Sequence, residues 1–393
     1  MTEYDDLYFT DSFELLSGSW DNTIKVWDTE NNVCTQTLTE HQDTVNCLEI
    51  LPNNKFASGS EDGTVVIWRK SSRDNYYCEN QFSVGDNNQV ECLKYVKLSN
   101  RATCSNRLLV GISNGEIYMF NLDDFDDQPV IFSGHQKPVR CLVLLLNSTH
   151  FASGSRDGSI MIWSLNTRQN NHQVSRPEQL LNDHEPDSEV TCFKKLSNGI
   201  FASGSTDSFI NIYMAGTNGE FFLIRRIAGH SQEVKCMCAI SPNLLIAGYA
   251  DGSIILRDLN SEFNNVRRLT PNENSEVECL QLLPLIDSNP NMKRLASGHR
   301  NGSIIIWMIP ELTNDNNQNI ENNLIHRFER VHNQPSSPQI GLSVYCLKIV
   351  KKKYLASGGE DGRINILSID PFDYQVCETY DEHNDEVVVL ALN

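Results

Sequence analysis

The chain has 393 residues, enough for two ordinary domains or for one large domain built from repeats. Its composition, 39% hydrophobic and 21% charged, is that of a soluble globular protein, and no apolar run approaches the roughly 18 residues that cross a bilayer. The formal charge of −19 argues against nucleic-acid or anionic-membrane binding, which need Lys and Arg, and it favours a basic partner. The acidic start, MTEYDDLYFT, lacks the basic and apolar regions of a secretory signal, so we predict that the protein is not secreted.

The first patterned stretch, residues 15–28, reads LLSGSWDNTIKVWD. A Ser-Gly strand end, a turn aspartate and an alternating apolar run predict two strands joined by a tight turn. The stretch resembles the middle of a structural unit, although it lies near the start of the chain. Trp20, directly before the turn residue Asp21, also requires an explanation.

The complete unit is seen at residues 41–68, HQDTVNCLEILPNNKFASGSEDGTVVIW. Three strands are predicted there, VNCLEI (45–50), FASGS (56–60) and TVVIW (64–68), and the sequence EDG (61–63) forms the tight turn between the last two. A fourth strand precedes the next histidine, as in CTQTLTEH (34–41). Four short strands with Gly, Asn and Asp turns predict antiparallel sheets.

Eight copies of this unit follow one another, at spacings of 41 to 60 residues. Each has Asp or Asn at the turn, in the order Asp21, Asp62, Asn114, Asp157, Asp207, Asp251, Asn301 and Asp361. The spacing varies in polar loops such as TNDNNQNIENN, where insertions cost little free energy. The acidic run DDFDD (123–127) is interpreted as a solvated loop between strands.

Seven of the twelve cysteines occupy one place in the repeat, the second residue after the first valine of the unit. They are Cys47, Cys92, Cys141, Cys192, Cys236, Cys279 and Cys346. The eighth copy has Val389 there, so the place requires a small apolar group and not a metal ligand. There is no C-x-x-C pair, and we therefore predict buried, reduced thiols and a cytoplasmic or nuclear protein.

These units resemble WD40 repeats, and the resemblance covers nearly the whole chain. It implies an all-β fold, an eight-bladed β-propeller of four-stranded antiparallel blades that forms a single domain over residues 1–393. It also implies a non-enzymatic interaction protein that needs no cofactor and no metal and acts as a monomeric propeller within a larger complex.

WD repeats typically contain a hydrogen-bonded quartet of His, Ser or Thr, Asp and Trp, which is stabilising only when each member has its partner. Blade 2 carries His41, Ser58, Asp62 and Trp68 at the corresponding positions, and blade 4 carries His135, Ser153, Asp157 and Trp163.

Other blades depart from the quartet. Blade 5 has Tyr213 in place of Trp beside His184, Ser203 and Asp207, and blade 6 keeps His230 and Asp251. Blade 7 has Ser297, Asn301 and Trp307 but no obvious His. Blade 8 has Ser357, Asp361 and Leu367, with His332 as an uncertain fourth member, and blade 3 is the least regular. Although the quartets resemble Ser/His/Asp catalytic sets, their repetition favours a structural role.

Blade 1 lacks its own histidine and first strand, and the C-terminal sequence HNDEVVVLALN supplies both. His383 precedes Val387 by four residues, as His41 precedes Val45. We therefore predict that residues 387–392 form the innermost strand of blade 1, which is then built from about 11–40 plus 383–393. In this arrangement His383 completes the quartet of Ser17, Asp21 and Trp27, and no sheet edge stays open between the first and last blades.

The resemblance places partner contacts at three positions per blade, on either side of the first valine and directly before the turn Asp. This set of positions contains eight Glu against four Lys or Arg. The strongest candidates are Trp20, Glu61, Arg140, Arg156, Lys235, Glu278, Arg300, Tyr345, Glu360 and Glu386. Trp20 and Tyr345 belong to neighbouring blades and could anchor a peptide, because aromatic side chains are enriched in binding hot spots.

Two functions are compatible with these residues. The first is a scaffold whose acidic top face binds a protein or a basic peptide. The alternative is the substrate-recognition subunit of a ubiquitin ligase, which the absence of a W-D-x-R signature disfavours: Trp27-Asp28 is followed by Thr29-Glu30, and Trp68 by Arg69.

Overall fold

The computed structural model describes residues 14–85, 87–99, 104–166, 174–228, 232–260, 266–269, 275–285, 293–309, 324–334 and 337–392. Their contacts divide the chain into two compact units. We call residues 38–228 the central unit and residues 14–37 together with 232–392 the terminal unit.

Each unit contains four sheets of four antiparallel strands, which we call blades 1 to 8 in chain order. In the central unit, blade 2 consists of β4 (Val45–Leu51), β5 (Lys55–Ser60), β6 (Thr64–Lys70) and β7 (Tyr76–Ser83). Blade 3 consists of β8 (Val90–Ser99), β9 (Cys104–Ile112), β10 (Ile117–Asn121) and β11 (Val130–Phe132). Blade 4 consists of β12 (Val139–Leu145), β13 (His150–Ser155), β14 (Ile160–Ser164) and β15 (Gln179–Leu181), with a 3-10 turn η1 at Leu146–Ser148. Blade 5 consists of β16 (Val190–Ser197), β17 (Ile200–Ser205), β18 (Phe209–Ala215) and β19 (Phe221–Ala228).

The terminal unit holds the other four blades. Blade 6 consists of β20 (Val234–Ser241), β21 (Leu244–Tyr249), β22 (Ile254–Asp258) and β23 (Val266–Leu269). Blade 7 consists of β24 (Val277–Leu283), β25 (Lys293–His299), β26 (Ile304–Ile309) and β27 (Leu324–Phe328). Blade 8 consists of β30 (Val344–Val350), β31 (Tyr354–Gly359), β32 (Ile364–Ser368) and β33 (Val376–Tyr380), preceded by the ribbon of β28 (Asn333–Gln334) and β29 (Ser337–Gly341). Blade 1 consists of β1 (Glu14–Ser19), β2 (Ile24–Asp28), β3 (Val33–Leu38) and β34 (Val387–Leu392).

The middle strands of a blade are buried along almost their whole length. In blade 4, five consecutive residues of β13 and four of β14 are buried, because blades 3 and 5 cover both faces of this sheet. A strand covered on both faces carries a continuous apolar run instead of an alternating one. The turn between β5 and β6 requires Gly63 at φ +76°, a conformation that side-chain-bearing residues rarely adopt.

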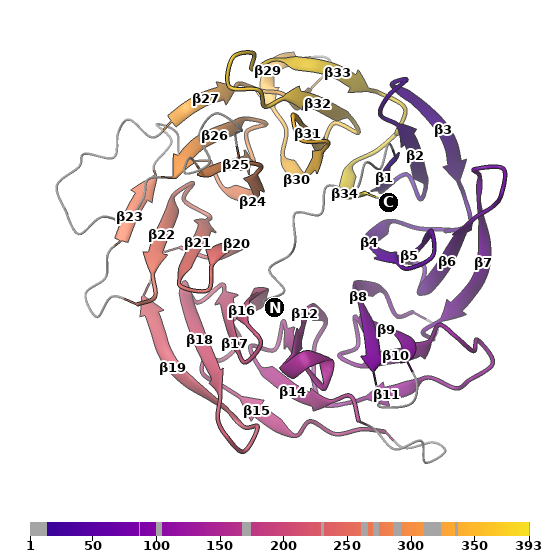
Figure 1. Ribbon diagram of the computed structural model, residues 1–393, viewed down its shortest axis with the longest axis vertical. Helices are drawn as coiled ribbons and strands as arrows, with labels where there is room; N and C mark the ends of the chain where they lie inside the picture. Colours follow the sequence, from indigo (N-terminus) through magenta and orange to yellow (C-terminus); the bar gives the residue numbers. More distant parts are fainter. Residues whose placement is uncertain are drawn as a thin grey trace. The chain divides into compact units, whose positions relative to one another are not determined.

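Blade 1 is assembled from both ends of the chain, as predicted. The C-terminal strand β34 pairs antiparallel with β1, and Leu15 lies opposite Leu392 (Figure 1). β34 begins at Val387 and ends at Leu392, so its predicted bounds are confirmed. The blade then packs on blade 8, where the Trp27 ring stacks on Tyr380 with 4.6 Å between centroids.

The repeated cysteines lie where neighbouring blades meet. The Cys92 thiol of blade 3 donates to the carbonyl oxygen of Val139 in blade 4 over 3.4 Å, and burial raises its pKa to about 12. A Cβ on Gly111 would lie 2.7 Å from this sulfur, so a small residue is needed opposite it. All twelve cysteines lie within the described residues, and none of them forms a disulfide.

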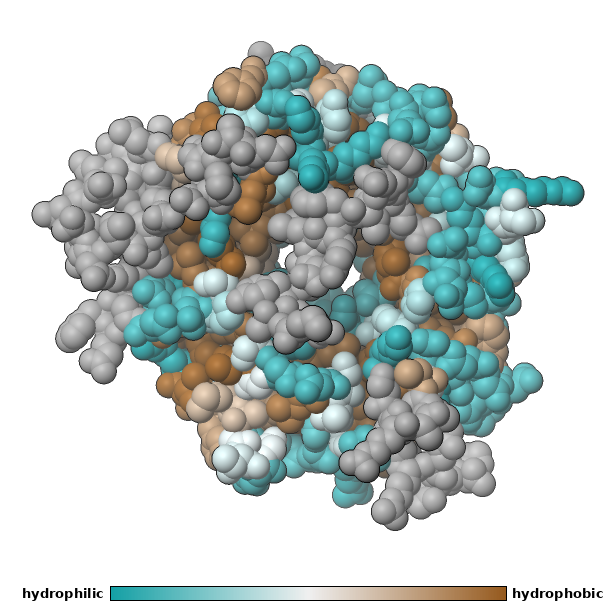
Figure 2. Space-filling model, viewed as in Figure 1, coloured by the Kyte–Doolittle hydropathy of each residue, from teal (hydrophilic) through white to brown (hydrophobic). Residues whose placement is uncertain are grey.

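Eight four-stranded antiparallel sheets in this order form an eight-bladed β-propeller fold, and the predicted fold class is confirmed. Among the described residues, no helix is both long and apolar enough to span a membrane. Figure 2 shows hydrophobic residues (brown) visible among hydrophilic ones (teal) on one face, which is ordinary for a folded surface.

Candidate functional site

The quartet of blade 1 joins residues that are more than 360 positions apart. The Oγ atom of Ser17 lies 2.7 Å from Nε2 of His383 and accepts a hydrogen bond from the indole of Trp27 over 2.8 Å. The other ring nitrogen of His383 lies 2.8 Å from Oδ2 of Asp21. These contacts connect the C-terminal segment to the turn between β1 and β2.

Blades 2 and 4 repeat this geometry within continuous stretches of chain. Ser58 lies 2.6 Å from His41 and 2.8 Å from the Trp68 indole, while His41 lies 3.2 Å from Asp62. In blade 4, Ser153 lies 2.7 Å both from His135 and from the Trp163 indole, and His135 lies 3.1 Å from Asp157.

Two histidines were misjudged in the sequence. His332 lies 2.9 Å from Ser357 and 2.6 Å from Asp361, so it is a full member of the blade 8 set despite the long loop after it. In blade 7, His299 at the end of β25 contacts Ser297 over 2.8 Å. It was missed because it lies in the second strand and not ahead of the first. His230 lies outside the described residues.

The turn aspartates are held as carboxylates. Burial acts to raise the pKa of Asp21, but the hydrogen bonds from His383 and Thr23 outweigh it and hold this pKa well below the usual 3.8. Asp62 and Asp157 show the same lowering for the same reasons. The serine hydroxyls beside them are fully buried and already accept a bond from Trp, so no substrate reaches them as they stand.

One backbone hydrogen bond recurs in all eight blades at the edge where the first strand begins, which we call the top edge. The residue before the turn Asp or Asn donates its N–H to the residue before the first valine, as Trp20 does to Glu386 over 3.0 Å. The other donors are Glu61, Ser113, Arg156, Thr206, Ala250, Arg300 and Glu360. In each blade, two of the three predicted contact positions are therefore neighbours.

In the central unit, the charges of the top edge are paired across blades 3, 4 and 5. Arg140 donates to Glu91 over 2.6 Å and to Glu189 over 2.7 Å, and Arg156 donates to Glu189 over 3.2 Å. Burial alone would lower the pKa of Arg140, but these two carboxylates raise it. Glu61 of blade 2 is different, because burial and nearby acids raise its pKa.

In the terminal unit, Glu276 accepts both basic side chains of the top edge. Lys235 lies 3.1 Å from Glu276 and 3.9 Å from Glu278, and Arg300 lies 2.5 Å from Glu276. Burial acts to raise the pKa of Glu276, but the two cations lower it overall. For Glu278, burial prevails and its pKa is raised.

The remaining predicted contact residues of the top edge lie on blades 8 and 1 and are Glu360, Tyr345 and Glu386. Glu360 accepts the backbone N–H of Ser343 over 2.9 Å. Burial and the adjacent Glu386 carboxylate raise the pKa of Tyr345. Burial also raises the pKa of Glu386, and the charges of Glu360 and Asp385 add to this effect.

Trp20, whose backbone N–H donates to Glu386, is 47% exposed, whereas Trp27, Trp68 and Trp163 are at most 1% exposed. The structure thus distinguishes the structural tryptophans from the one that solvent reaches.

A cleft of about 460 Å³ opens on the top edge of the terminal unit. Its lining residues are Lys235, Glu278, Arg300, Gly341, Leu342, Ser343, Tyr345 and Glu360. The contact pattern had indicated five of these (Lys235, Glu278, Arg300, Tyr345 and Glu360) among the strongest candidates, with Ser343 in the wider set. Gly341 and Leu342 were not expected, because the ribbon before β30 has no counterpart in the repeat.

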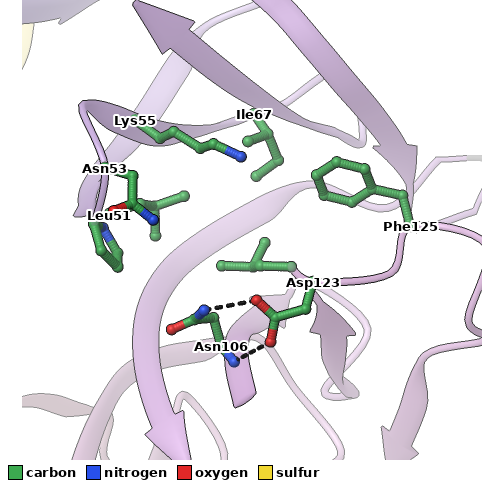
Figure 3. Close-up of a pocket in the computed structure, with 9 residues that line it drawn as sticks. Leu51, Asn53, Lys55, Ile67, Asn106, Asp123 and Phe125 are labelled. Atoms are coloured by element: carbon green, nitrogen blue, oxygen red, sulfur yellow. Dashed lines mark hydrogen bonds between the residues drawn. The ribbon is translucent and has the colours of Figure 1, made fainter. Parts of the chain in front are cut away.

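A second pocket, of about 50 Å³, lies between blades 2 and 3 beneath Phe125 (Figure 3). Asn106 donates two hydrogen bonds into it, to both oxygens of Asp123. Its volume admits one or a few waters and no side chain of a partner. Phe125 also stands edge-on to Phe82, so the acidic run at 123–127 is partly packed and not merely solvated.

The described residues contain no group of three or more His, Cys, Asp or Glu side chains arranged to hold a metal ion.

Comparison with known proteins identifies the repeat. Residues 6–28, 32–69 and 127–164 match the family model of the WD domain, G-beta repeat. An uncharacterized WD repeat-containing protein of Schizosaccharomyces pombe is 27% identical over 64% of this chain and 64% of its own length. The ubiquitin fusion degradation protein 3 homolog of Caenorhabditis elegans is 26% identical over 56% of this chain and 24% of its own length.

Both matches leave more than a third of the relative uncovered. Among solved structures, Sqt1 of Chaetomium thermophilum, bound to the N-terminus of the ribosomal protein L10, is similar with a TM-score of 0.70 and 16% identity. The match covers 90% of this chain and 92% of that one. The computationally designed Ika8 protein is similar with a TM-score of 0.66 and 21% identity, over 91% of this chain and 93% of that one. These likenesses establish the fold.

Proposed function

Since this chain is a WD40-repeat protein with eight blades, we propose that it is a non-enzymatic scaffold that binds a peptide or protein partner at the top edge of its blades. The observation that carries the proposal is Trp20, which remains 47% exposed and whose backbone N–H donates to the carbonyl oxygen of Glu386. A large exposed aromatic side chain among polar ones is typical of a binding hot spot.

The chemistry of the surroundings supports a peptide ligand. The volume of the cleft falls in the range of about 300–1,000 Å³ that ligand sites occupy, and its lining residues include a tyrosine and four charged residues. WD40 propellers generally mediate protein–protein interactions, and the similar Sqt1 structure holds the N-terminus of another protein. We place the protein in the cytoplasm or the nucleus, as one propeller within a larger complex.

A second function is favoured by one relative, the ubiquitin fusion degradation protein 3 homolog. In that case the same top edge would select substrates for a ubiquitin ligase. Both functions use the same surface and differ in what accompanies the propeller.

Affinity capture with the wild-type chain and Trp20→Ala tests the proposal. We expect Trp20→Ala to lose most of the captured partner. Phe372→Ala should retain it, because this residue is 92% exposed but lies in the turn between β32 and β33, at the other end of β32 from the top edge. Unchanged partners in Trp20→Ala would contradict binding at this edge. Recovery of ligase subunits would favour the second function.

A further inference from the structure

The cleft of the terminal unit has two ends of different character. Lys235, Glu278 and Arg300 line it from blades 6 and 7, and Tyr345 and Glu360 line it from blade 8. The Tyr345 side chain lies beside Glu386 at the start of β34. The charges at the two ends are neutralised to different degrees.

At the end formed by blades 6 and 7, cations and anions are paired. Glu276 forms ion pairs with Lys235 at 3.1 Å and with Arg300 at 2.5 Å, and Lys235 forms a longer one with Glu278 at 3.9 Å. Both basic side chains at this end are thus engaged by Glu276 and Glu278, and the charge of Glu233 also acts on Lys235. A partner's charge of either sign would have to compete with ion pairs that already exist.

At the end formed by blades 8 and 1, the carboxylates have no ion-pair partner, and Arg300 acts on Glu360 only through its charge at longer range. Within the part of the chain that the structure describes, neither Glu360 nor Glu386 forms an ion pair with Lys or Arg. Oε2 of Glu386 is inaccessible to solvent and has no hydrogen-bond partner among those residues. The Tyr345 phenol hydrogen-bonds to the same carboxylate. A partly desolvated carboxylate without a countercharge costs free energy, which a positively charged group bound beside it would offset.

The aromatic groups at this end suit the same ligand. Tyr345 lines the cleft, hydrogen-bonds to Glu386 through its phenol and is affected by the charge of Glu360. The backbone N–H of the exposed Trp20 donates to the carbonyl oxygen of Glu386. A guanidinium or ammonium group is attracted both by carboxylates and by the faces of aromatic rings.

We infer that this end of the cleft binds one Arg or Lys side chain of the partner peptide, with Glu360 and Glu386 as its anionic acceptors and Tyr345 as its aromatic wall. The inference rests on the proposed function and specifies the ligand of that site. It assigns the partner's cation to the terminal unit and not to blades 3–5, where Arg140 and Arg156 already occupy Glu91 and Glu189.

The test is a selection of random heptapeptides displayed on phage, carried out on the full chain. Three proteins are compared: the wild type, the Glu360→Gln/Glu386→Gln variant and a Glu30→Gln/Glu329→Gln control. The control removes two exposed glutamates of the same unit, so both variants change the net charge equally. A thermal melt of each protein verifies folding.

We expect the wild type and the control to enrich peptides with Arg or Lys at one fixed position. Loss of the two charge-assisted contacts should reduce this enrichment about tenfold or more in the Glu360→Gln/Glu386→Gln variant. Peptides that bind without a fixed Arg or Lys, or equal enrichment in that variant, would overturn the inference while the proposed function stands. If the wild type selects no peptide at all, the proposed function itself fails.

Discussion

The two units of the chain both pair charges on the top edge, as Glu276 pairs with Lys235 and Arg300 in the terminal unit, but they differ in how completely. In the central unit, the acids Glu91 and Glu189 are bound by Arg140, and Glu189 also accepts Arg156. In the terminal unit, Glu360 and Glu386 have no described basic partner. The repeat supplies identical backbone positions in both, so the difference comes only from the side chains.

This difference supports our proposal that the partner binds to the terminal unit. A paired network contributes modestly to stability, whereas crowded and desolvated carboxylates reduce it. Proteins retain such groups mainly where function requires them, which favours the terminal unit as the ligand-binding part.

The largest effect is expected from the closure of the terminal unit. Removal of residues 383–393 deletes β34 and His383, and with them the buried side chains of Val387 and Leu390, each worth about 1.5–3 kcal/mol. Since the domain is held by about 5–15 kcal/mol, we expect the cooperative unfolding transition to disappear. Circular dichroism during heating checks this, and an unchanged melting temperature would contradict it.

Only part of β34 carries this stabilisation. Val387, Leu390 and Ala391 are buried, but Val388, Val389 and Leu392 are partly exposed, so the strand buries less than its apolar sequence suggests.

The quartets allow a matched comparison between the units. His383→Ala and His135→Ala each remove a buried ring that contacts Ser and Asp, and each should lower the free energy of unfolding by about 1–3 kcal/mol. Urea unfolding of both variants measures the loss. A His383→Ala variant as stable as the wild type would show that blade 1 does not depend on its C-terminal histidine.

Neutralising one top-edge acid in each unit should have opposite effects. Glu189→Gln weakens the contacts to Arg140 and Arg156 and should destabilise the protein by about 0.5–1 kcal/mol, the usual size for such partly exposed pairs. Glu386→Gln removes a carboxylate that burial and its acidic neighbours disfavour, and it should raise the urea midpoint slightly. If both substitutions changed the urea midpoint in the same direction, the difference between the units would be contradicted.

The smallest effect is a pH dependence of peptide binding. Because the pKa of Glu386 is raised above the usual 4.5, this group gains its proton at a higher pH than an ordinary glutamate as the solution is acidified. Tyr345, Glu360 and Asp385 face it, and none of them supplies a compensating positive charge. Binding of an Arg-containing peptide should therefore weaken as pH falls from 7 towards 5, as measured by fluorescence anisotropy, and Glu360→Gln/Glu386→Gln should abolish the dependence.

We also expect the free energy of unfolding to decrease in acid. The folded pKa values of Asp21, Asp62 and Asp157 are lowered, so the stability that these groups contribute is present above the usual carboxyl value of 3.8 and is lost as pH falls below it.

The sequence predicted much of the site because the repeat fixes local geometry. The turn Asp marks the top edge, and the backbone bond next to it brings the adjacent contact positions together in every blade. Regular repeats therefore revealed the quartets of blades 2 and 4. His299 and the loop at Gly341 and Leu342 were missed, since both depart from the repeat.

By itself, the sequence determined the repeat and the eight blades, because periodic apolar runs and turn residues act over short distances. It also determined the pairing of β34 with β1, because the first unit lacks a strand and a histidine that the C-terminal sequence supplies. The tertiary structure decided which charges are neutralised. Whether a carboxylate meets a cation depends on side chains from other blades, as Glu189 meets Arg140 and Arg156, and no spacing along one strand encodes that meeting. Trp20 and Trp27, seven positions apart, differ from these charges, because their places in the repeat already predicted that the first is exposed and the second buried.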